Sequence, residues 1–359
     1  MNYAVVIPTL NPDSKMTDFV DVLVSSGYEK IILVNDGSSA ETVKYFEQAA
    51  AHPQVTVLTH EVNRGKGAGL KTAFRYLAEN CPDVDAAITA DADGQHTVDS
   101  INRCTAAFAE NPGSVIFGGR EFSDKKIPFR SRFGNKISSV VYRFSCGIKL
   151  NDTQTGLRIV PAAYFEPFSV LKGDRYEYET HMIIAVREMH IPYVEVPIET
   201  IYIDDNASSH FNPIKDSARI YKIVLGYFFK FLASSLISWV VDIAVYTILV
   251  MILEGKTDTQ TMEIIAGAAS RIISSIVNFI LNRKVVFKAV DDVKSTAIRY
   301  YILAFCQMGI SIFLVNIIAD TLLQVPGLWH TVIKCIVDGC LFIFSYGIQR
   351  KWVFKNKKI

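Results

Sequence analysis

Short apolar runs alternate with amphipathic stretches over the first 227 residues or so. The runs are rich in β-branched residues and cover residues 3–7, 30–34, 55–59, 85–90 and 114–118. Between them, apolar residues recur at helical spacing near 14–26, 40–51, 67–80 and 98–110. Strands separated by helices are typical of a parallel sheet. The pattern therefore predicts an α/β domain with a Rossmann-like, mostly parallel sheet.

From residue 229 onward the chain consists largely of four long apolar stretches. They cover about 229–253, 262–282, 299–322 and 331–349, and each approaches the roughly 20 residues that a helix needs to cross a bilayer. Buried helices of a soluble domain are the alternative, but so many apolar stretches leave too little polar surface to cover them. The sequence predicts an α/β domain over 1–212, an amphipathic linker over 213–228 and an all-α domain of four transmembrane helices over 229–359.

Positive charge gathers on one side of the predicted membrane domain. Lysines and arginines precede the first span, separate the second from the third and follow the fourth, whereas the connectors near 254–261 and 323–330 carry little positive charge. Basic loops stay in the cytoplasm. No basic segment precedes the first apolar run, so no signal peptide is expected. We therefore expect a multi-pass protein of the cytoplasmic membrane, with both termini and the α/β domain in the cytoplasm.

Two similar segments indicate that the membrane domain is a duplicated hairpin. Residues 282–288 read NRKVVFK and residues 349–355 read QRKWVFK, and both follow an even-numbered span. Chance matching of basic residues beside a membrane is the alternative. Ionisable residues inside the spans are expensive in hydrocarbon and are functional candidates by default. They are Asp242, Arg271, Lys334 and Asp338, of which we expect the first two to pair.

Composition limits the function further. The chain has 37 Lys and Arg against 36 Asp and Glu, a net charge of +1, and a mean hydropathy of +0.23. A protein this close to neutral lacks the cationic surface that a nucleic-acid backbone requires, so no nucleic-acid partner is expected. The six cysteines have neither a CxxC nor a metal-ligand spacing, and we expect them to be reduced.

The strongest local signal is the segment DADGQH at residues 91–96, directly after an apolar run. Asp91 and Asp93 lie two apart on a turn that Gly94 permits, so both can offer oxygens to one hard divalent cation. Mg²⁺ or Mn²⁺ keeps open positions for substrate phosphates at such a site. A solvated acidic turn is the alternative for this segment taken alone.

Two further polar loops follow predicted strands. Asp36 and the segment Pro8-Thr9-Leu10-Asn11 lie at strand ends, where ligands bind in parallel sheets. A helix-capping role for Asp36 is the alternative. In the segment NRGKG at residues 63–67, glycines allow close approach of the backbone, and Lys66 suits a diphosphate.

Together these motifs resemble those of the family 2 glycosyltransferases of the GT-A fold, and most of all the polyprenyl-phosphate hexosyltransferases and dolichyl-phosphate mannose synthases. The four apolar stretches resemble a GtrA-like membrane domain. The resemblance rests on residues 7–11, 36–38, 63–67, 91–96, 118–120 and 152–158. The family often has Glu after the Asn of its first motif, where this chain has Pro12, so the base of the nucleotide stays open between uracil and guanine.

The resemblance implies a role for each of twelve residues. The nucleotide is bound by Pro8, Thr9, Asn11, Asp36, Lys66 and Gly67. The metal, Mg²⁺ or Mn²⁺, is held by Asp91, Asp93 and Gln95. The lipid phosphate is received by Arg120 with Arg130 or Arg132. The catalytic residues are Asp91, Asp93 and Arg120.

The implied reaction is the inverting transfer of a hexose from a donor of the UDP-glucose or GDP-mannose type to undecaprenyl or dolichyl phosphate, for cell-envelope glycan or protein glycosylation. A phosphate monoester is largely dianionic at neutral pH, so no strong general base is required. Residues 128–146 mix basic with apolar residues, as in a helix that lies in a membrane interface. Self-association is a further expectation. The alternative function is that of a lipid-linked sugar flippase or anchor with an inactive transferase domain.

Overall fold

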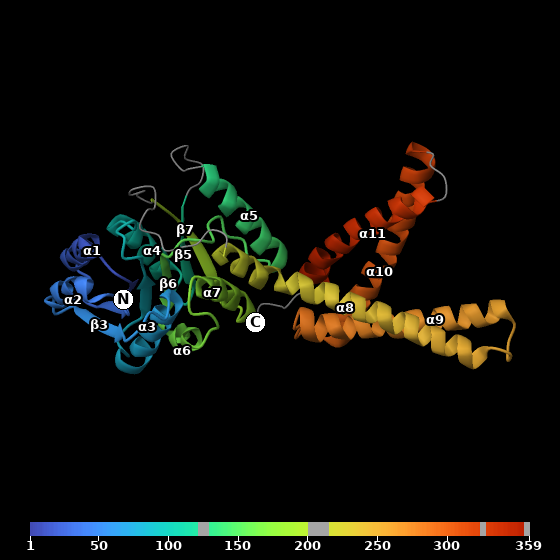
Figure 1. Ribbon diagram of the computed structural model, residues 1–359, viewed down its shortest axis with the longest axis horizontal. Helices are drawn as coiled ribbons and strands as arrows, with labels where there is room; N and C mark the ends of the chain where they lie inside the picture. Colours follow the sequence, from blue (N-terminus) through green and yellow to red (C-terminus); the bar gives the residue numbers. More distant parts are fainter. Residues whose placement is uncertain (121–128, 200–214, 324–327, 355–359) are drawn as a thin grey trace. The chain divides into compact units, whose positions relative to one another are not determined.

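The computed structural model describes residues 1–120, 129–199, 215–323 and 328–354. It contains two compact units, residues 1–224 and 225–359. The first unit combines a sheet with helices, and the second is built from long helices (Figure 1).

Seven strands form one sheet in the first unit, in the order β3-β2-β1-β4-β6-β5-β7. The strands are β1 (Tyr3–Thr9), β2 (Ile31–Asp36), β3 (Val55–His60), β4 (Ala86–Thr89), β5 (Val115–Arg120), β6 (Arg158–Pro161) and β7 (Tyr193–Ile198). Strand β6 runs antiparallel to both of its neighbours, and the other pairs are parallel. The mostly parallel sheet is confirmed, and β6 and β7 join the five strands that the apolar runs predict.

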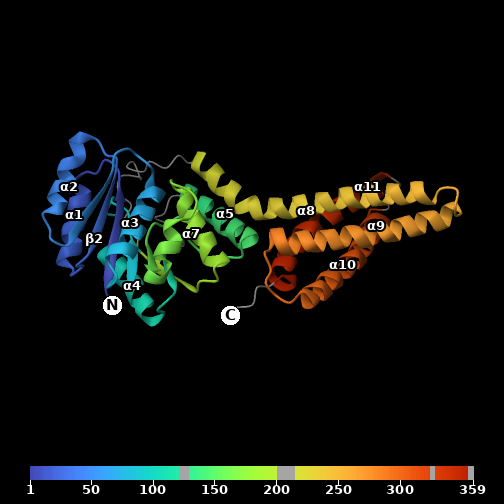
Figure 2. The same cartoon turned by 90° about the horizontal axis from the view of Figure 1, so that it is seen from below.

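Helices cover both faces of the sheet (Figures 1 and 2). They are α1 (Ser14–Ser25), α2 (Val43–Ala50), α3 (Lys66–Asn80), α4 (Val98–Glu110), α5 (Phe129–Ser145), α6 (Phe165–Ser169) and α7 (Glu177–Glu188). Residues of α1, α2 and α4 share one hydrophobic core with the sheet. The central strands β1 and β2 are buried along almost their whole length, which explains why they read as continuous apolar runs.

Local hydrogen bonds fix where helices begin after the strands. The Asp13 side chain accepts from the Lys15 backbone N–H at 2.9 Å and caps α1. Thr97 Oγ1 accepts from the Ser100 N–H at 3.1 Å and caps α4. Each cap satisfies a backbone donor that the first turn of a helix leaves without a partner. The polar loops between strands and helices are thereby held at one edge of the sheet.

Gly67 provides the close packing of α3 against α7. A Cβ atom on Gly67 would lie 2.4 Å from the Tyr178 Cβ and 2.8 Å from the Arg175 carbonyl oxygen. We expect Gly67→Ala to lower the free energy of unfolding by about 1–3 kcal/mol, since overpacking forces the backbone to shift. Denaturant unfolding measures this change. Gly134→Ala in α5 is the control, because no heavy atom lies within 4 Å of the added Cβ, and an equal loss there would contradict the packing argument.

Four long helices follow the sheet domain. The first of them begins in the last residues of the first unit, and the other three lie in the second unit. The four helices are α8 (Lys215–Leu253), α9 (Thr259–Leu281), α10 (Val293–Val315) and α11 (Leu328–Ile348). Each contributes to a segment long and apolar enough to span a membrane: Ala218–Leu253, Thr259–Val286, Val293–Ala319 and Trp329–Val353. The four predicted transmembrane helices are thus confirmed as elements.

The two copies of the repeated segment have the same conformation. Asn282–Val286 after α9 and Gln349–Val353 after α11 are both π-helical turns, η4 and η6. Asn282 Nδ2 donates to Gln349 Oε1 at 3.1 Å, so the first residues of the two copies bond to each other. A shared rare conformation at matching positions supports the duplicated hairpin.

The ionisable residues within the spans form local pairs. Arg271 Nη1 lies 3.4 Å from Asp242 Oδ2, as the sequence predicts, and Ser274 Oγ donates to the same carboxylate at 3.2 Å. In the second hairpin, Lys334 Nζ lies 2.9 Å from Asp338 Oδ2, one helical turn away. Pairing reduces the free-energy cost of placing each charge in hydrocarbon.

The Asp242–Arg271 pair leads to a charge-exchange prediction. We expect Asp242→Arg or Arg271→Asp alone to reduce the yield of folded protein, because each leaves two like charges facing one another in the membrane. The double exchange restores an attractive pair and should recover most of the yield. Size-exclusion chromatography of detergent extracts measures it, and no recovery in the double variant would count against the pair.

Candidate active site

A cleft of about 650 Å³ lies at the carboxyl ends of β1, β2 and β4. In open α/β sheets this edge is where ligands bind. Among the residues predicted for the site, nine line the cleft: Pro8, Thr9, Asn11, Asp36, Lys66, Asp91, Asp93, Gln95 and Arg120. Gly67 and Arg132 are not among the lining residues, and the side chain of Arg130 lies outside the described residues.

The acidic turn after β4 holds its two carboxylates differently. Asp93 Oδ1 accepts from the Gln95 backbone N–H at 3.0 Å, across a turn in which Gly94 has a φ of +72°. Burial and the neighbouring Asp91 carboxylate raise the pKa of Asp93. Burial alone would also raise the pKa of Asp91, but the Lys66 ammonium and then His96 lower it well below its usual range. Asp91 is therefore the more strongly anionic of the two.

Lys66 lies at the start of α3 and contacts two carboxylates. Its Nζ is 2.5 Å from Asp91 Oδ1 and 3.2 Å from Glu179 Oε1, a residue in the first turn of α7. Burial opposes the charge of Lys66, but the two carboxylates raise its pKa on balance. The positive end of α3 adds to the cationic character of this wall of the cleft.

The acidic turn suits a hard divalent cation. Asp91, Asp93 and the Gln95 amide offer oxygen ligands, which Mg²⁺ and Mn²⁺ prefer. The Lys66 ammonium already lies on Asp91 as a stand-in cation. Glycine at position 156 leaves room beside the same carboxylate, because a Cβ there would lie 2.5 Å from Asp91 Oδ2. Within the described residues no group of three or more His, Cys, Asp or Glu could hold a metal ion by itself.

Asp36 shapes the loop that precedes α3. Its carboxylate is almost fully buried and accepts from the backbone N–H groups of Arg64 at 2.9 Å and Gly65 at 2.7 Å. His60 Nδ1 lies 2.7 Å from the same carboxylate. Asp36 thus fixes the backbone beside Lys66, and the predicted contact of Asp36 with the nucleotide stays a prediction.

The loops after β1 and β2 are tied to each other. Asn11, which has a φ of +48°, accepts at Oδ1 from the Ser39 backbone N–H at 2.8 Å. Its own backbone N–H donates to Ser38 Oγ at 2.9 Å. The reciprocal bonds hold Asn11 in place among the residues that line the cleft.

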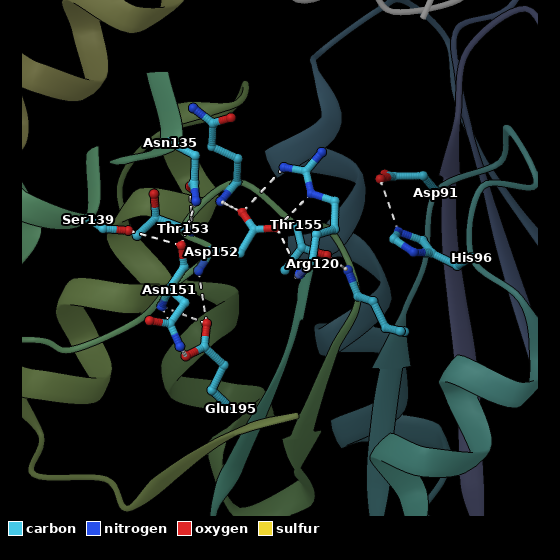
Figure 3. A network of polar contacts seen from close by, with 12 residues as sticks. Asp91, His96, Arg120, Asn135, Ser139, Asn151, Asp152, Thr153, Thr155 and Glu195 are labelled. Atoms are coloured by element: carbon cyan, nitrogen blue, oxygen red, sulfur yellow. Dashed lines mark hydrogen bonds and ion pairs between the residues drawn. The ribbon is translucent and has the colours of Figure 1, made fainter. Parts of the chain in front are cut away.

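Arg120 lies across the cleft from the acidic turn and is oriented by a buried carboxylate (Figure 3). Arg120 Nε donates to Asp152 Oδ2 at 2.6 Å, and Nη2 donates to Oδ1 at 3.3 Å. The Asp152 side chain has no exposed surface, whereas 17% of the Arg120 side chain is exposed. This two-pronged pair directs a guanidinium toward the cleft, where it can bind a phosphate.

Glu195 on β7 anchors the loop that carries Asp152 (Figure 3). Its carboxylate accepts from the Asn151 backbone N–H at 2.7 Å and the Asp152 N–H at 2.8 Å. A Cβ on Gly119 would lie 2.7 Å from Glu195 Oε1, so glycine in β5 makes room for this contact. Sequence reasoning missed Glu195, and the alternation of polar and apolar residues in YVEVPI at 193–198 is the signal that indicates a strand there.

Arg158 at the start of β6 is a buried cation that sequence reasoning also left without a role. It is 1% exposed. Its guanidinium donates to the carbonyl oxygens of Glu179 at 2.8 Å and Thr155 at 3.3 Å, and lies 5.4 Å from the centre of the Phe117 ring. It therefore ties the loop beside Asp91 to the helix that carries Glu179. An arginine inside a short apolar run is the signal that marks it.

His96 is a further buried polar residue of the cleft. Its Nε2 is 3.5 Å from Asp91 Oδ2 (Figure 3), and among the residues that the structure describes neither ring nitrogen has a hydrogen-bond partner. A buried imidazole whose ring nitrogens make no hydrogen bond is available to a ligand that brings its own hydrogen-bonding groups.

Helix α5 carries an apolar face that points to solvent and a polar face on the cleft. Phe133, Ile137 and Val140 are exposed, at the spacing of one helical face. Ser138 and Tyr142 on the other face line the cleft, and Tyr142 donates to Thr180 Oγ1 at 2.9 Å. The amphipathic helix predicted over 128–146 is present as Phe129–Ser145.

Two family matches cover most of the chain. Residues 4–166 match the glycosyl transferase family 2, and residues 230–354 match the GtrA/DPMS transmembrane domain. The first match contains the acidic turn and Arg120. The second contains the four apolar helices from Lys230 onward.

Individual relatives agree with the first match. An uncharacterized protein of Methanocaldococcus jannaschii is 29% identical over 225 residues, which are 62% of this chain and 90% of the relative. The UDP-N-acetylglucosamine–dolichyl-phosphate N-acetylglucosaminyltransferase of Methanococcus voltae is 29% identical over 222 residues, 55% of this chain and 85% of the relative. Among solved structures, the glucosyl-3-phosphoglycerate synthase of Mycobacterium tuberculosis with Mn²⁺ and UDP is 13% identical, with a TM-score of 0.44 over 62% of this chain and 77% of that one.

Proposed function

Because this chain is a glycosyltransferase with a family 2 domain and a GtrA/DPMS transmembrane domain, we propose that it transfers a hexose from a nucleotide sugar to a polyprenyl phosphate at the cytoplasmic face of the membrane. One observation carries the proposal. A single cleft has an acidic turn with Lys66 on one side and the oriented guanidinium of Arg120 on the other. Such a cleft suits two phosphate-bearing substrates on either side of a sugar.

The donor occupies the side of the cleft at β1, β2 and α3. Asn11 and the loops tied to it receive the nucleoside, and the diphosphate lies against the amino end of α3 with Lys66. Asp91, Asp93 and Gln95 would hold Mg²⁺ or Mn²⁺, which would neutralise charge on the leaving diphosphate. Asp36 acts on the same region by holding the backbone of Arg64 and Gly65.

The acceptor enters on the side of Arg120 and α5. Arg120 binds the lipid phosphate, and Asp152 keeps the guanidinium in its orientation. The apolar face of α5 meets the bilayer and is accompanied by Lys136 and Arg143, which attract anionic lipid. Arg130 or Arg132 assists at the same phosphate. The relative from Methanococcus voltae, by its name, acts on dolichyl phosphate, which is the same class of acceptor.

The reaction itself is a displacement at the anomeric carbon. The acceptor phosphate attacks as a dianion, so the side chains need to neutralise and align the two substrates and need not remove a proton. Attack from the face opposite the leaving diphosphate inverts the anomeric configuration. The basic loops around the four spans support a cytoplasmic position for the cleft and both termini.

Release of nucleoside diphosphate tests the proposal. Purified protein is incubated with a panel of UDP and GDP sugars and Mn²⁺ or Mg²⁺, with and without undecaprenyl phosphate. We expect one donor to release its nucleotide only when the lipid is present, with formation of a lipid-linked sugar. Nucleotide release that ignores the lipid, or no release from any donor, would overturn the proposed reaction.

Removal of the metal gives a separate prediction. We expect EDTA to lower lipid-dependent transfer by at least about 100-fold, because the diphosphate then leaves without its neutralising cation. Added Mn²⁺ or Mg²⁺ in excess should restore the rate, whereas Ca²⁺, which prefers more ligands at longer distances, should restore it poorly. Full activity in EDTA would exclude this role of the acidic turn.

A further inference from the structure

The ammonium of Lys66 lies where the predicted metal site needs an open oxygen. Lys66 Nζ is 2.5 Å from Asp91 Oδ1, and both residues line the cleft. A divalent ion such as Mg²⁺ approaches its carboxylate ligands to about 2.0–2.1 Å. An ammonium and a metal ion that contact the same oxygen would lie close together and repel each other strongly. Metal binding at Asp91 therefore favours a state in which Lys66 has left this contact.

A second carboxylate provides an alternative partner for the lysine. Glu179 Oε1 lies 3.2 Å from Lys66 Nζ, and the Glu179 side chain is only 13% exposed. The backbone of Glu179 is fixed as well, because its backbone carbonyl oxygen accepts a hydrogen bond from the buried Arg158 guanidinium at 2.8 Å. The lysine can leave Asp91 without losing every anionic neighbour. The phosphates of the donor would offer it still stronger acceptors.

We propose that Lys66 holds Asp91 in the nucleotide-free enzyme and that the entering nucleoside diphosphate draws the ammonium away, which opens Asp91 to the metal. The inference rests on the proposed function, because it assigns the donor diphosphate and the divalent cation to this cleft. Lys66 thereby couples the two ligands: each favours the state in which the lysine has left Asp91. The metal then binds well only together with the nucleotide.

This coupling is measurable as a free-energy linkage. The nucleotide strengthens metal binding by some factor, and the metal strengthens nucleotide binding by the same factor. Removal of the lysine abolishes the part of this factor that arises from its movement. A lysine that stays in place acts on the metal to the same extent with and without nucleotide, so its removal would leave the factor unchanged.

The test compares the wild-type enzyme with Lys66→Gln and Lys66→Met. Mn²⁺ binding without nucleotide is followed by electron paramagnetic resonance of the free ion. The dissociation constant of radiolabelled UDP, or of GDP if the enzyme releases that nucleotide, is measured without and with saturating Mn²⁺. Formation of the metal–nucleotide complex in solution is the same for all proteins and cancels in the comparison.

We expect both variants to bind Mn²⁺ alone about 10-fold more tightly than the wild type, and to lose about 10-fold of the coupling factor. Lys71→Gln is the matched control, because Lys71 lies on the same helix, pairs with Asp174 at 2.5 Å and is not among the residues that line the cleft. It should leave both quantities unchanged. A coupling factor in the Lys66 variants equal to that of the wild type would overturn the inference.

A structure of the wild-type enzyme with Mn²⁺ and the nucleotide tests the inference without any variant. Lys66 Nζ should then lie beyond hydrogen-bond distance of the Asp91 carboxylate, and retention of the present contact would overturn the exchange. Failure of the proposed function gives a different result, in which the wild type shows neither lipid-dependent nucleotide release nor Mn²⁺-dependent nucleotide binding. If the wild type carries out lipid-dependent transfer but the Lys66 variants keep the wild-type coupling between metal and nucleotide, the lysine exchange alone is overturned.

Discussion

Asp93→Asn should lower the rate of sugar transfer by about 10³-fold and leave the fold intact. Asp93 would help to hold the cation that neutralises charge on the leaving diphosphate, and loss of such charge stabilisation in a cleft has an effect of this size. The Asp93 carboxylate accepts a hydrogen bond from the Gln95 backbone N–H in its own turn. An asparagine can accept that bond too, so the turn should keep its shape. The change removes the anionic charge and little else.

Activity and folding are separated by measuring them on the same preparation. The rate is the lipid-dependent release of nucleoside diphosphate at saturating metal, and the fold is checked by thermal unfolding. Asp99→Asn is the control, because Asp99 lies in the same part of the chain but its side chain is 67% exposed and pairs with Arg103 on the surface of α4. It should retain near-normal transfer. A rate within tenfold of the wild type for Asp93→Asn would remove Asp93 from the metal site.

In the first unit, the sequence predicted those strands that are formed by a single apolar run. The strands β1 to β5 are short apolar runs between helices, and the sheet buries most of them on both faces, so burial and sequence pattern agree. Strand β6 escaped prediction because it is four residues long and begins with Arg158. Its charge is offset by carbonyl oxygens of Thr155 and Glu179, which the local sequence cannot reveal.

The membrane unit was predictable for a different reason. A bilayer demands long apolar helices, so four such stretches specify four elements almost without regard to packing. The repeated segments at residues 282–288 and 349–355 further indicated the duplication, and both adopt π-helical turns. The hydrogen bond between Asn282 and Gln349 joins the two hairpins and depends on their tertiary arrangement.

At the candidate site, the sequence predicted which residues lie together because they follow the ends of neighbouring strands. The partners of these residues depend on contacts over long separations in the chain. The Lys66–Asp91 pair joins α3 to the turn after β4, and Glu195 reaches the Asp152 loop only because β7 lies beside β5. For Asp36 the sequence indicated a place at the cleft, and the structure adds that the carboxylate also supports the backbone of Arg64 and Gly65.

The buried pair of Arg120 and Asp152 leads to the largest expected effect on stability. We expect Asp152→Asn to lower the free energy of unfolding of the first unit by about 3 kcal/mol. Loss of one member of a buried ion pair costs about 3–5 kcal/mol, and access of Arg120 to water in the cleft puts this pair at the lower end. Asp152 also accepts from the backbone N–H groups of Arg120 at 3.2 Å and Gln154 at 2.9 Å, so the loop loses an anchor as well.

Pulse proteolysis across a urea series measures this loss in the full-length protein. Asp83→Asn is the matched control, since Asp83 forms an ion pair with Lys30 at 3.2 Å but 59% of its side chain is exposed. A surface pair of this kind contributes about 0–1 kcal/mol. We further expect Asp152→Asn to weaken use of the lipid acceptor more than binding of the nucleotide, because the orientation of Arg120 is lost while the α3 side of the cleft is unchanged. Equal losses of stability in the two variants would show that burial adds nothing to the Arg120–Asp152 pair.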